Sequence, residues 1–298
     1  MSVIDTRYCY ERCTPAQPTA LILLNCESAA GAPKLSPFLC ALWSVASVRL
    51  CADGAASRLF HSIVRDALGC REPGAAPEGA EHGNAAVASA LRAYLPDEIV
   101  GDWDSIDART EAYYRGAGVA LFPQPEDQDS TDLEKCFKRL VVRQGQHQQR
   151  LRVVVAGSFG GRLDHTVQNL NCLFKWTPHF EALSMITEHS LACLLPHGGC
   201  EVRVASPMEG PTCGILPLKG PTVLSTQGLQ WDVAGAPSEF GGMVSTSNSV
   251  CGLPGGDPGA PVVQVHASVD CVWTIGVNPG SVAACGGGGG GNVVEGAT

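Results

Sequence analysis

Three short segments of the chain carry side chains suited to binding a metal ion and phosphate. Residues 101–105 read GDWDS, residues 127–132 read DQDSTD, and residues 160–165 read GGRLDH. Carboxylate oxygens are the hard ligands that Mg²⁺ prefers, and a guanidinium on a glycine-rich turn is suited to phosphate oxygens. Together the three segments predict a site for a metal-bound polyphosphate.

The pair Asp102 and Asp104 is the first candidate for metal binding. Side chains two residues apart on an extended strand end project to the same side, so both carboxylates can reach one cation. The alternative is a solvated turn that caps the helix after Ser105 or Asp107. An isolated Asp-x-Asp motif is weak, and it is the other acidic segments that favour the metal interpretation.

The segment TDLE that starts at Thr131 fits a capping box, with Thr131 as the N-cap and Glu134 reaching back to it. Asp132 then lies in the first helical turn, where a carboxylate interacts favourably with the helix dipole. That role is compatible with binding a metal. Asp127 and Asp129 flank the same turn, and such close acids repel one another unless a cation or an arginine is present.

The glycine-rich turn at residues 157–162 follows a predicted buried strand and precedes a predicted helix from about His165 to Phe174. Small residues let the backbone approach phosphate oxygens, and a helix N-terminus presents free N–H groups. The chain contains no Gly-Lys pair, which excludes a Walker-type P-loop. Phosphate must therefore be held by Arg162, backbone amides and the metal. His165 is a candidate general base, although a histidine at such a position is more often a surface residue.

Short apolar segments alternate with helical patterns in the first half of the chain. Strands are expected at residues 20–25, 48–52, 98–101, 119–122 and 151–156, and helices at 37–47, 55–68, 107–115 and 132–143. This alternation predicts a parallel α/β sheet. Ligands bind beyond the carboxyl ends of the strands in such sheets, and Asp53, the acidic segments and Arg162 all follow a predicted strand.

From about residue 181 the pattern changes to short alternating stretches separated by Gly and Pro. Strands at 191–195, 200–204, 213–216, 223–226, 242–246 and 262–265 predict an antiparallel β-sandwich. Trp231 and Trp273 lie in this part, and either is more often a core residue than a platform for a ligand. The polar run at residues 245–248, STSN, reads by itself as a turn.

The composition is that of a protein large enough for two cores. Its 298 residues are 45% hydrophobic and 16% charged, and the mean hydropathy is +0.07. A net charge of -9 without any basic run argues against nucleic-acid binding. The 14 cysteines show no Cys-x-x-Cys pair or zinc-type spacing, so free thiols in a reducing compartment are expected. With no recognisable signal peptide and no long apolar run, a cytoplasmic protein without a membrane partner is expected.

Two segments resemble additions without a core of their own. Residues 71–90 are rich in Gly, Ala, Pro and Glu, and an uninterrupted glycine run extends from Gly286 to Gly291. Such compositions bury too little apolar surface to offset the entropy cost of ordering. We therefore expect a catalytic domain at 15–180 with a flexible insertion at 71–90, a β-sandwich domain at 181–278, and a disordered tail at 279–298.

Six segments, taken in order, resemble the eukaryotic thiamine pyrophosphokinases: CADGA at 51–55, GDWDSI at 101–106, DQDSTD at 127–132, GGRLDH at 160–165, GLQW at 228–231 and VSTSN at 244–248. The resemblance spans about residues 19–277. It implies an N-terminal parallel α/β nucleotide-binding domain followed by a C-terminal antiparallel β-sandwich domain that binds thiamine. It also implies transfer of the diphosphoryl group of ATP to the thiamine hydroxyl, giving thiamine diphosphate and AMP, in a homodimer with shared active sites.

The resemblance also implies roles for individual residues. Asp102, Asp104 and Asp132 would be the Mg²⁺ ligands, Arg162 would clamp the phosphates, and Asp164 would orient thiamine or accept its proton. A further set is expected to bind ATP or thiamine: Asp53, Gly54, Gln128, Asp129, Thr131, Gly161, Trp231, Ser245 and Asn248. Among these, Trp231 would form an aromatic wall supplied by the partner subunit.

Two alternatives to the kinase are open at this point. One is a non-catalytic thiamine or nucleotide sensor that keeps the pocket without turnover. The other is a different Mg²⁺- and nucleotide-dependent transferase on the same scaffold. The intact set of acids counts against the sensor.

Overall fold

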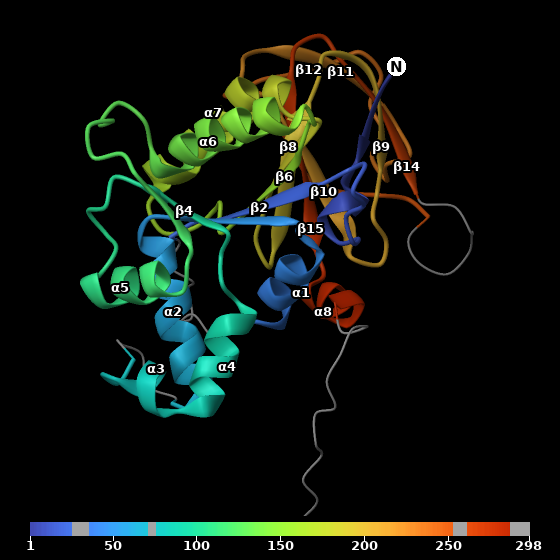
Figure 1. Cartoon of the computed structure of the whole chain (residues 1–298). Coiled ribbons are helices and arrows are strands. Elements are labelled where there is room, and N and C mark those ends of the chain that lie inside the picture. The colour runs from blue at the N-terminus through green and yellow to red at the C-terminus, as the bar shows by residue number, and fades with distance from the viewer. Residues whose placement is uncertain (26–35, 71–75, 253–260, 287–298) are drawn as a thin grey trace, which may run out of the picture.

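The computed structural model describes residues 1–25, 36–70, 76–252 and 261–286, and two β-sheets organise this part of the chain (Figure 1). The large sheet has ten strands in the order β13-β10-β15-β8-β7-β6-β2-β3-β4-β5, and the small sheet has five in the order β1-β9-β14-β11-β12. The large sheet is mixed, because its strands are parallel toward one end and antiparallel toward the other, and helices pack around it.

The half of the large sheet from β7 to β5 is parallel. Its strands are β2 (Thr19–Leu23), β3 (Val48–Ala52), β4 (Glu98–Gly101), β5 (Ala120–Pro123), β6 (Arg152–Ala156) and β7 (Ala182–Ile186). The predicted strands at β2 to β6 are confirmed within two residues at each end, whereas β7 was not predicted. The strand order reverses between β2 and β6, which is the point where open α/β sheets bind their ligands.

Helices cover both faces of the parallel half (Figure 1). Leu21 and Val154 share a core with helices α1 (Pro37–Val45) and α2 (Gly54–Ala67). Their strand neighbours, Ile22 and Val155 among them, point to the opposite face and share a second core with α6 (Asp132–His147) and α7 (Leu163–Trp176). Helix α5 (Ala108–Gly116) completes the set of helices predicted from the sequence. Within the described ranges, no helix has a stretch long and apolar enough to span a bilayer.

The antiparallel half of the large sheet and the small sheet form the predicted β-sandwich. Strand β7 pairs antiparallel with β8, so the large sheet continues without a break into β8 (Ser190–Leu195), β15 (Cys271–Val277), β10 (Glu209–Leu216) and β13 (Ser245–Ser249). The small sheet contains β1 (Ser2–Asp5), β9 (Gly198–Arg203), β14 (Val262–Ala267), β11 (Thr222–Gln227) and β12 (Ala236–Ser238). Trp273, 1% exposed, packs in the core between the two sheets with Ile215 and Val265.

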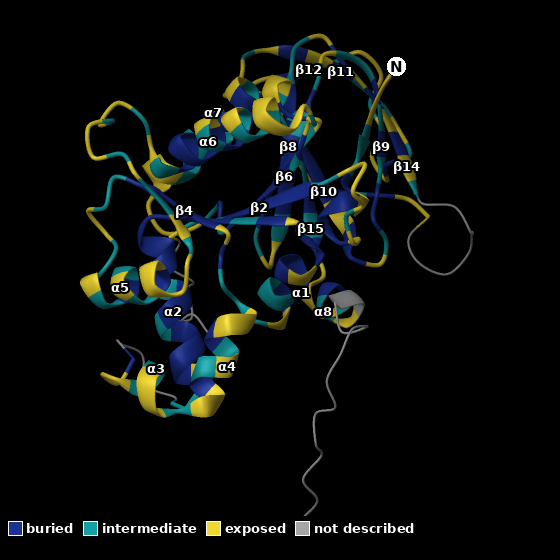
Figure 2. Cartoon of the chain, viewed as in Figure 1, coloured by how far each residue is buried: buried dark blue, intermediate teal, exposed yellow. Residues whose placement is uncertain are grey.

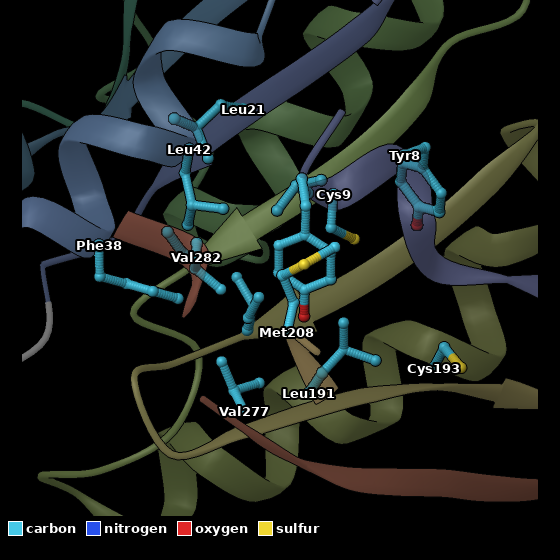
Figure 3. Close-up of a cluster of buried hydrophobic side chains, with 14 of the residues drawn as sticks. Tyr8, Cys9, Leu21, Phe38, Leu42, Leu191, Cys193, Met208, Val277 and Val282 are labelled. Atoms are coloured by element: carbon cyan, nitrogen blue, oxygen red, sulfur yellow. The ribbon is translucent and has the colours of Figure 1, made fainter. Parts of the chain in front are cut away.

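The N-terminal segment, which precedes both predicted domains, joins the two halves. Strand β1 pairs parallel with β9 of the small sheet. Directly after it, the Tyr8 hydroxyl donates to Ser184 Oγ of β7 over 2.8 Å, and Tyr8 and Cys9 are buried in the core shown in Figure 3. The segment therefore contacts the small sheet and the large sheet at once.

The tail that was expected to be disordered from residue 279 begins instead with helix α8 (Pro279–Gly286). This helix lies beside α1 (Figure 1), and Val282, 1% exposed, packs in the same cluster as Phe38 and Leu42 (Figure 3). The expectation was wrong for residues 279–286, because one apolar side chain facing α1 is enough to dock a short helix. Residues 287–298 lie outside the described part.

The insertion predicted to be flexible at 71–90 is also structured where it is described. It contains α3 (Ala80–Gly83) and α4 (Ala85–Ala93), and Asn84 Oδ1 caps α4 by accepting from the N–H groups of Ala86 and Val87. Figure 2 shows both buried and exposed positions along α4. Val87 and Leu91, both 0% exposed, lie one turn apart and pack in the core. The prediction from composition failed because alanine favours helices and two apolar residues at i and i+4 suffice to bury one face. Residues 71–75 are outside the described part.

Replacing Leu91 by alanine tests the packing of α4. The substitution should lower the free energy of unfolding by about 2–5 kcal/mol, because it leaves a cavity in a closed core. Urea denaturation followed by circular dichroism measures the loss. Arg92→Ala, at the exposed next position of the same helix, is the control; equal effects of the two substitutions would contradict the packing of α4.

Candidate active site

Asp53 lies at the carboxyl end of β3, where it forms the N-cap of α2. Its side chain is fully buried, and its backbone adopts φ +39°, a strained conformation for a residue with a Cβ. Oδ2 accepts a hydrogen bond of 2.9 Å from the Ser105 N–H, whereas Oδ1 has no partner among the described residues. One buried carboxylate oxygen is therefore left available for a cation.

Two glycines allow the loops around Asp53 to meet. A Cβ at Gly101 would lie 2.4 Å from Asp53 Cβ, and a Cβ at Gly54 would lie 2.5 Å from Asn25 Nδ2. Neither distance is sterically allowed, so a side chain at either position would push apart the ends of β2, β3 and β4. The sequence motifs around Asp53 and Asp102 thus depend on close backbone approach.

The structure brings the carboxylates of Asp53, Asp102 and Asp104 together, with one oxygen of each within 4.8 Å of the others. Three carboxylates at this spacing, one of them with an unpartnered oxygen, fit a divalent cation with oxygen ligands. Two of the predicted metal ligands are in this group, and the third member is Asp53, which had been assigned to the nucleotide. Asp132 lies next to the group but faces Lys135, whose Nζ is 3.4 Å from Asp132 Oδ1 and 3.0 Å from Asp102 Oδ2.

The crowding of these acids changes their proton affinities. Burial, together with the charges of Asp132 and Asp102, raises the pKa of Asp53 to about 6. Burial and the Asp102 charge also raise the pKa of Asp132. Burial acts in the same direction on Asp102, but the hydrogen bond and charge of Lys135 outweigh it and hold the pKa of Asp102 below its usual value. A cation is therefore most favourable on the Asp53 side of the group.

A cavity of about 360 Å³ opens beside these acids at the point where the strand order reverses. It is lined by residues that follow β2, β3 and β6 and by the start of α6, among them Asn25, Arg58, Thr131, Asp132, Gly160, Gly161, Arg162 and His165. The predicted phosphate turn and Arg162 thus face the same space as Asp132. Arg58, whose Nε donates to Asn25 Oδ1 over 2.8 Å, adds a second guanidinium that sequence reasoning missed.

Arg162 and Asp164 form a two-bonded ion pair at the mouth of this cavity. The Arg162 Nη2–Asp164 Oδ2 distance is 2.5 Å and the Nε–Oδ1 distance is 3.1 Å, with both side chains more than 60% exposed. Hydrogen bonds from the guanidinium lower the pKa of the Asp164 carboxyl. Asp164 in this pair is a weak proton acceptor, and Arg162 Nη1 takes no part in the pair.

The loop before α6 contributes less to the cavity than the sequence predicted. Gln128 and Asp129 are exposed and do not line the cavity, and the Gln128 amide donates to the carbonyl of Pro125 over 2.8 Å. Thr131 caps α6 as predicted, since its Oγ1 accepts from the Glu134 N–H. The Glu134 carboxylate, however, binds Lys175 of α7 over 2.5 Å instead of reaching back to Thr131.

Trp231, Ser245 and Asn248 line a second cavity of about 220 Å³ in the β-sandwich, together with Leu224 and Met243. Trp231 is 58% exposed and so is not a core residue. The Asn248 side chain braces the Trp231 loop, because its Oδ1 accepts from the Trp231 N–H and its Nδ2 donates to the Trp231 carbonyl. The two cavities share no lining residue among the described residues.

The raised pKa of Asp53 predicts a pH dependence of stability. Because the pKa of Asp53 is about 6 in the folded protein and about 3.8 in the unfolded chain, the contribution of Asp53 to the free energy of unfolding should fall as the pH rises between these values. Asp53→Asn cannot titrate, and in EDTA at about pH 8 it should be more stable than wild type by about 1–3 kcal/mol. Urea denaturation across this pH range measures the difference, with the exposed Glu126→Gln as control. Parallel pH curves for wild type and Asp53→Asn would contradict the assignment.

Comparison with known proteins agrees with this geometry. The catalytic-domain profile of thiamin pyrophosphokinase matches residues 39–186, and the vitamin B1 binding-domain profile of the same enzyme matches residues 199–252. Thiamine pyrophosphokinase 1 of Arabidopsis thaliana is 32% identical over 268 residues, which cover 87% of this chain and 86% of the relative. Thiamine pyrophosphokinase 2 of Oryza sativa is 32% identical over 265 residues, covering 88% and 87%.

Solved structures show the same fold. The crystal structure of yeast thiamin pyrophosphokinase superposes with a TM-score of 0.74 at 21% identity, covering 95% of this chain and 93% of the yeast chain. Thiamin pyrophosphokinase from Candida albicans gives a TM-score of 0.68 at 24% identity, with 93% and 92% covered. On the match of both profiles and of the plant relatives along most of its length, the chain belongs to the thiamine pyrophosphokinase family.

Proposed function

We propose that this protein is a Mg²⁺-dependent thiamine diphosphokinase that converts ATP and thiamine to AMP and thiamine diphosphate. The observation that carries the proposal is the group of Asp53, Asp102 and Asp104 next to a cavity that also holds Arg58 and Arg162. Membership of the family supports it, and an intact group of acids favours an enzyme over a sensor that has lost turnover. We expect the protein to act in the cytoplasm.

Different residues at and beside the cavity are expected to bind the metal ion and the phosphates of ATP. Asp53, Asp102 and Asp104 would hold Mg²⁺, which when bound supplies positive charge to the phosphate oxygens. The backbone N–H groups at Gly161 and at the start of α7 would donate to the phosphate oxygens, with Arg58 and Arg162 at the sides of the phosphate chain. Attack of an alcohol on phosphorus needs alignment and charge stabilisation more than a strong base, which fits a site whose Asp164 is paired with Arg162.

Thiamine is expected to bind against Trp231. We propose that a homodimer brings the Trp231 side chain of one subunit to the acids of the other. Thiamine is a cation, so an aromatic face and a nearby acidic group both favour its binding. The two cavities share no lining residue among the described residues, which supports a site that a second chain completes. Apolar side chains are exposed beside both cavities, namely Leu163 and Val167 on α7 and Trp231 and Phe240 in the sandwich.

An assay of the adenine product tests the reaction. Purified protein with ATP, MgCl₂ and thiamine should release AMP and thiamine diphosphate, and EDTA should abolish the reaction. Asp104→Asn should lower kcat by roughly 10²-fold or more, since it removes a charge next to the transferred group, while Glu126→Gln should keep full activity. Release of ADP, or full activity in Asp104→Asn, would refute the proposed reaction or metal site respectively.

Complementation tests the shared site. Asp104→Asn and Trp231→Ala, each inactive alone, should regain about one quarter of wild-type activity when co-expressed in equal amounts, because half the dimers are mixed and each mixed dimer has one intact site. Asp104→Asn mixed with Asp102→Asn is the matched control and should stay inactive. If isolated mixed dimers of the first pair are inactive, the site is not shared.

A further inference from the structure

Lys135 is a charged residue of α6 that is buried completely, with its side chain 1% exposed. Its position three residues after Asp132 puts both side chains on one face of the helix. The ammonium is 3.0 Å from Asp102 Oδ2 and 3.4 Å from Asp132 Oδ1, so it bridges a residue of β4's carboxyl end and a residue of α6. Burying an ammonium is costly, and these two carboxylates are what stabilise it.

The ammonium does not line the cavity beside the acids, so it is not placed to touch ATP. It contacts Asp102 instead. Asp102 is the acid that belongs both to the group with Asp53 and Asp104 and to the ion pair with Lys135. On one side Asp102 joins Asp53 and Asp104 at metal-binding spacing, and on the other side it binds Lys135. Lys135 binds Oδ2 of Asp102, and Oδ1 accepts a hydrogen bond of 3.4 Å from the Asp104 N–H, so both contacts fix the orientation of this carboxylate in the acidic group.

We propose that Lys135 is a positioning residue that acts as a permanent internal counter-cation of the metal site. It holds Asp102 and Asp132 in place when no divalent cation is bound, and it offsets one of the four negative charges of Asp53, Asp102, Asp104 and Asp132. A divalent ion is then directed to the open side of Asp102, between Asp53 and Asp104. This role rests on the metal site proposed above.

Thermal melts of Lys135→Met in EDTA and in excess MgCl₂ test the role. Methionine keeps the volume of the stem, so a lysine used only for packing would be replaceable with little effect in both buffers. We expect a lower Tm in EDTA, a larger rise in Tm on adding MgCl₂ than wild type shows, and an apparent Kd for Mg²⁺ about tenfold lower, because the carboxylates lose their fixed cation. Lys135→Arg should keep the wild-type response to Mg²⁺.

Lys175→Met is the matched control, because Lys175 is also paired with a carboxylate, Glu134, but away from the acids. Its response to Mg²⁺ should equal that of wild type. If wild type itself shows no rise in Tm with MgCl₂, the proposed metal site is refuted, and the proposed role of Lys135 is refuted as well. If wild type responds and Lys135→Met responds to the same extent, only the role of Lys135 is wrong.

Steady-state kinetics give a second readout. With MgCl₂ saturating, Lys135→Met should lose about 10- to 100-fold in kcat because Asp102 and Asp132 lose their orientation, while the KM for thiamine changes less than about twofold. Should Lys135→Met yield no folded protein even in MgCl₂, the melts are made on Lys135→Gln, which keeps a hydrogen-bond donor without the charge. An unchanged Mg²⁺ response of that variant overturns the proposal.

Discussion

Repulsion between carboxylates that lie close together, with Asp53 buried among them, is the constraint on which the rim of the large sheet depends. Parallel strands fix the backbone positions of Asp53 and Asp102, so these side chains cannot separate to relieve it. Three features accommodate these charges: a strained backbone at Asp53, a glycine at position 101 that leaves room for the Asp53 side chain, and the buried ammonium of Lys135. Each of them fits a site that binds positive charge.

A second constraint comes from the continuity of the large sheet. Hydrogen bonds between β7 and β8 join the parallel and antiparallel halves directly, and the N-terminal segment reinforces the junction through Tyr8. The two halves therefore share one sheet at this described junction. The register of β7 with β8 sets how the acidic rim and the Trp231 cavity lie relative to each other.

Much of this arrangement was predictable from the sequence because the signals are local. The continuous apolar runs predicted β2 to β6. Because acids follow the predicted strands, the sequence also predicted that the carboxylates of Asp102 and Asp104 lie together, as they do in the structure. The errors concern contacts made across the fold. Helix α8 and the helices of the insertion depend on one or two apolar residues that meet a distant surface. Lys135 and Arg58 look like ordinary residues on the polar side of a helix until the fold shows what they face. For Lys135 the spacing of three residues from Asp132 was a usable signal, whereas the partner of Arg58, Asn25, is distant in the sequence.

The pairing of β1 with β9 has a consequence for how the chain acquires its structure. Ser2 pairs in register with Cys200, so β1 has to wait for a partner strand that is translated much later. The α/β half can assemble around β2 to β6 during that interval, since domains generally fold as units. The small sheet, by contrast, closes late, and until then the backbone of β1 is an unprotected edge that chaperones would have to shield.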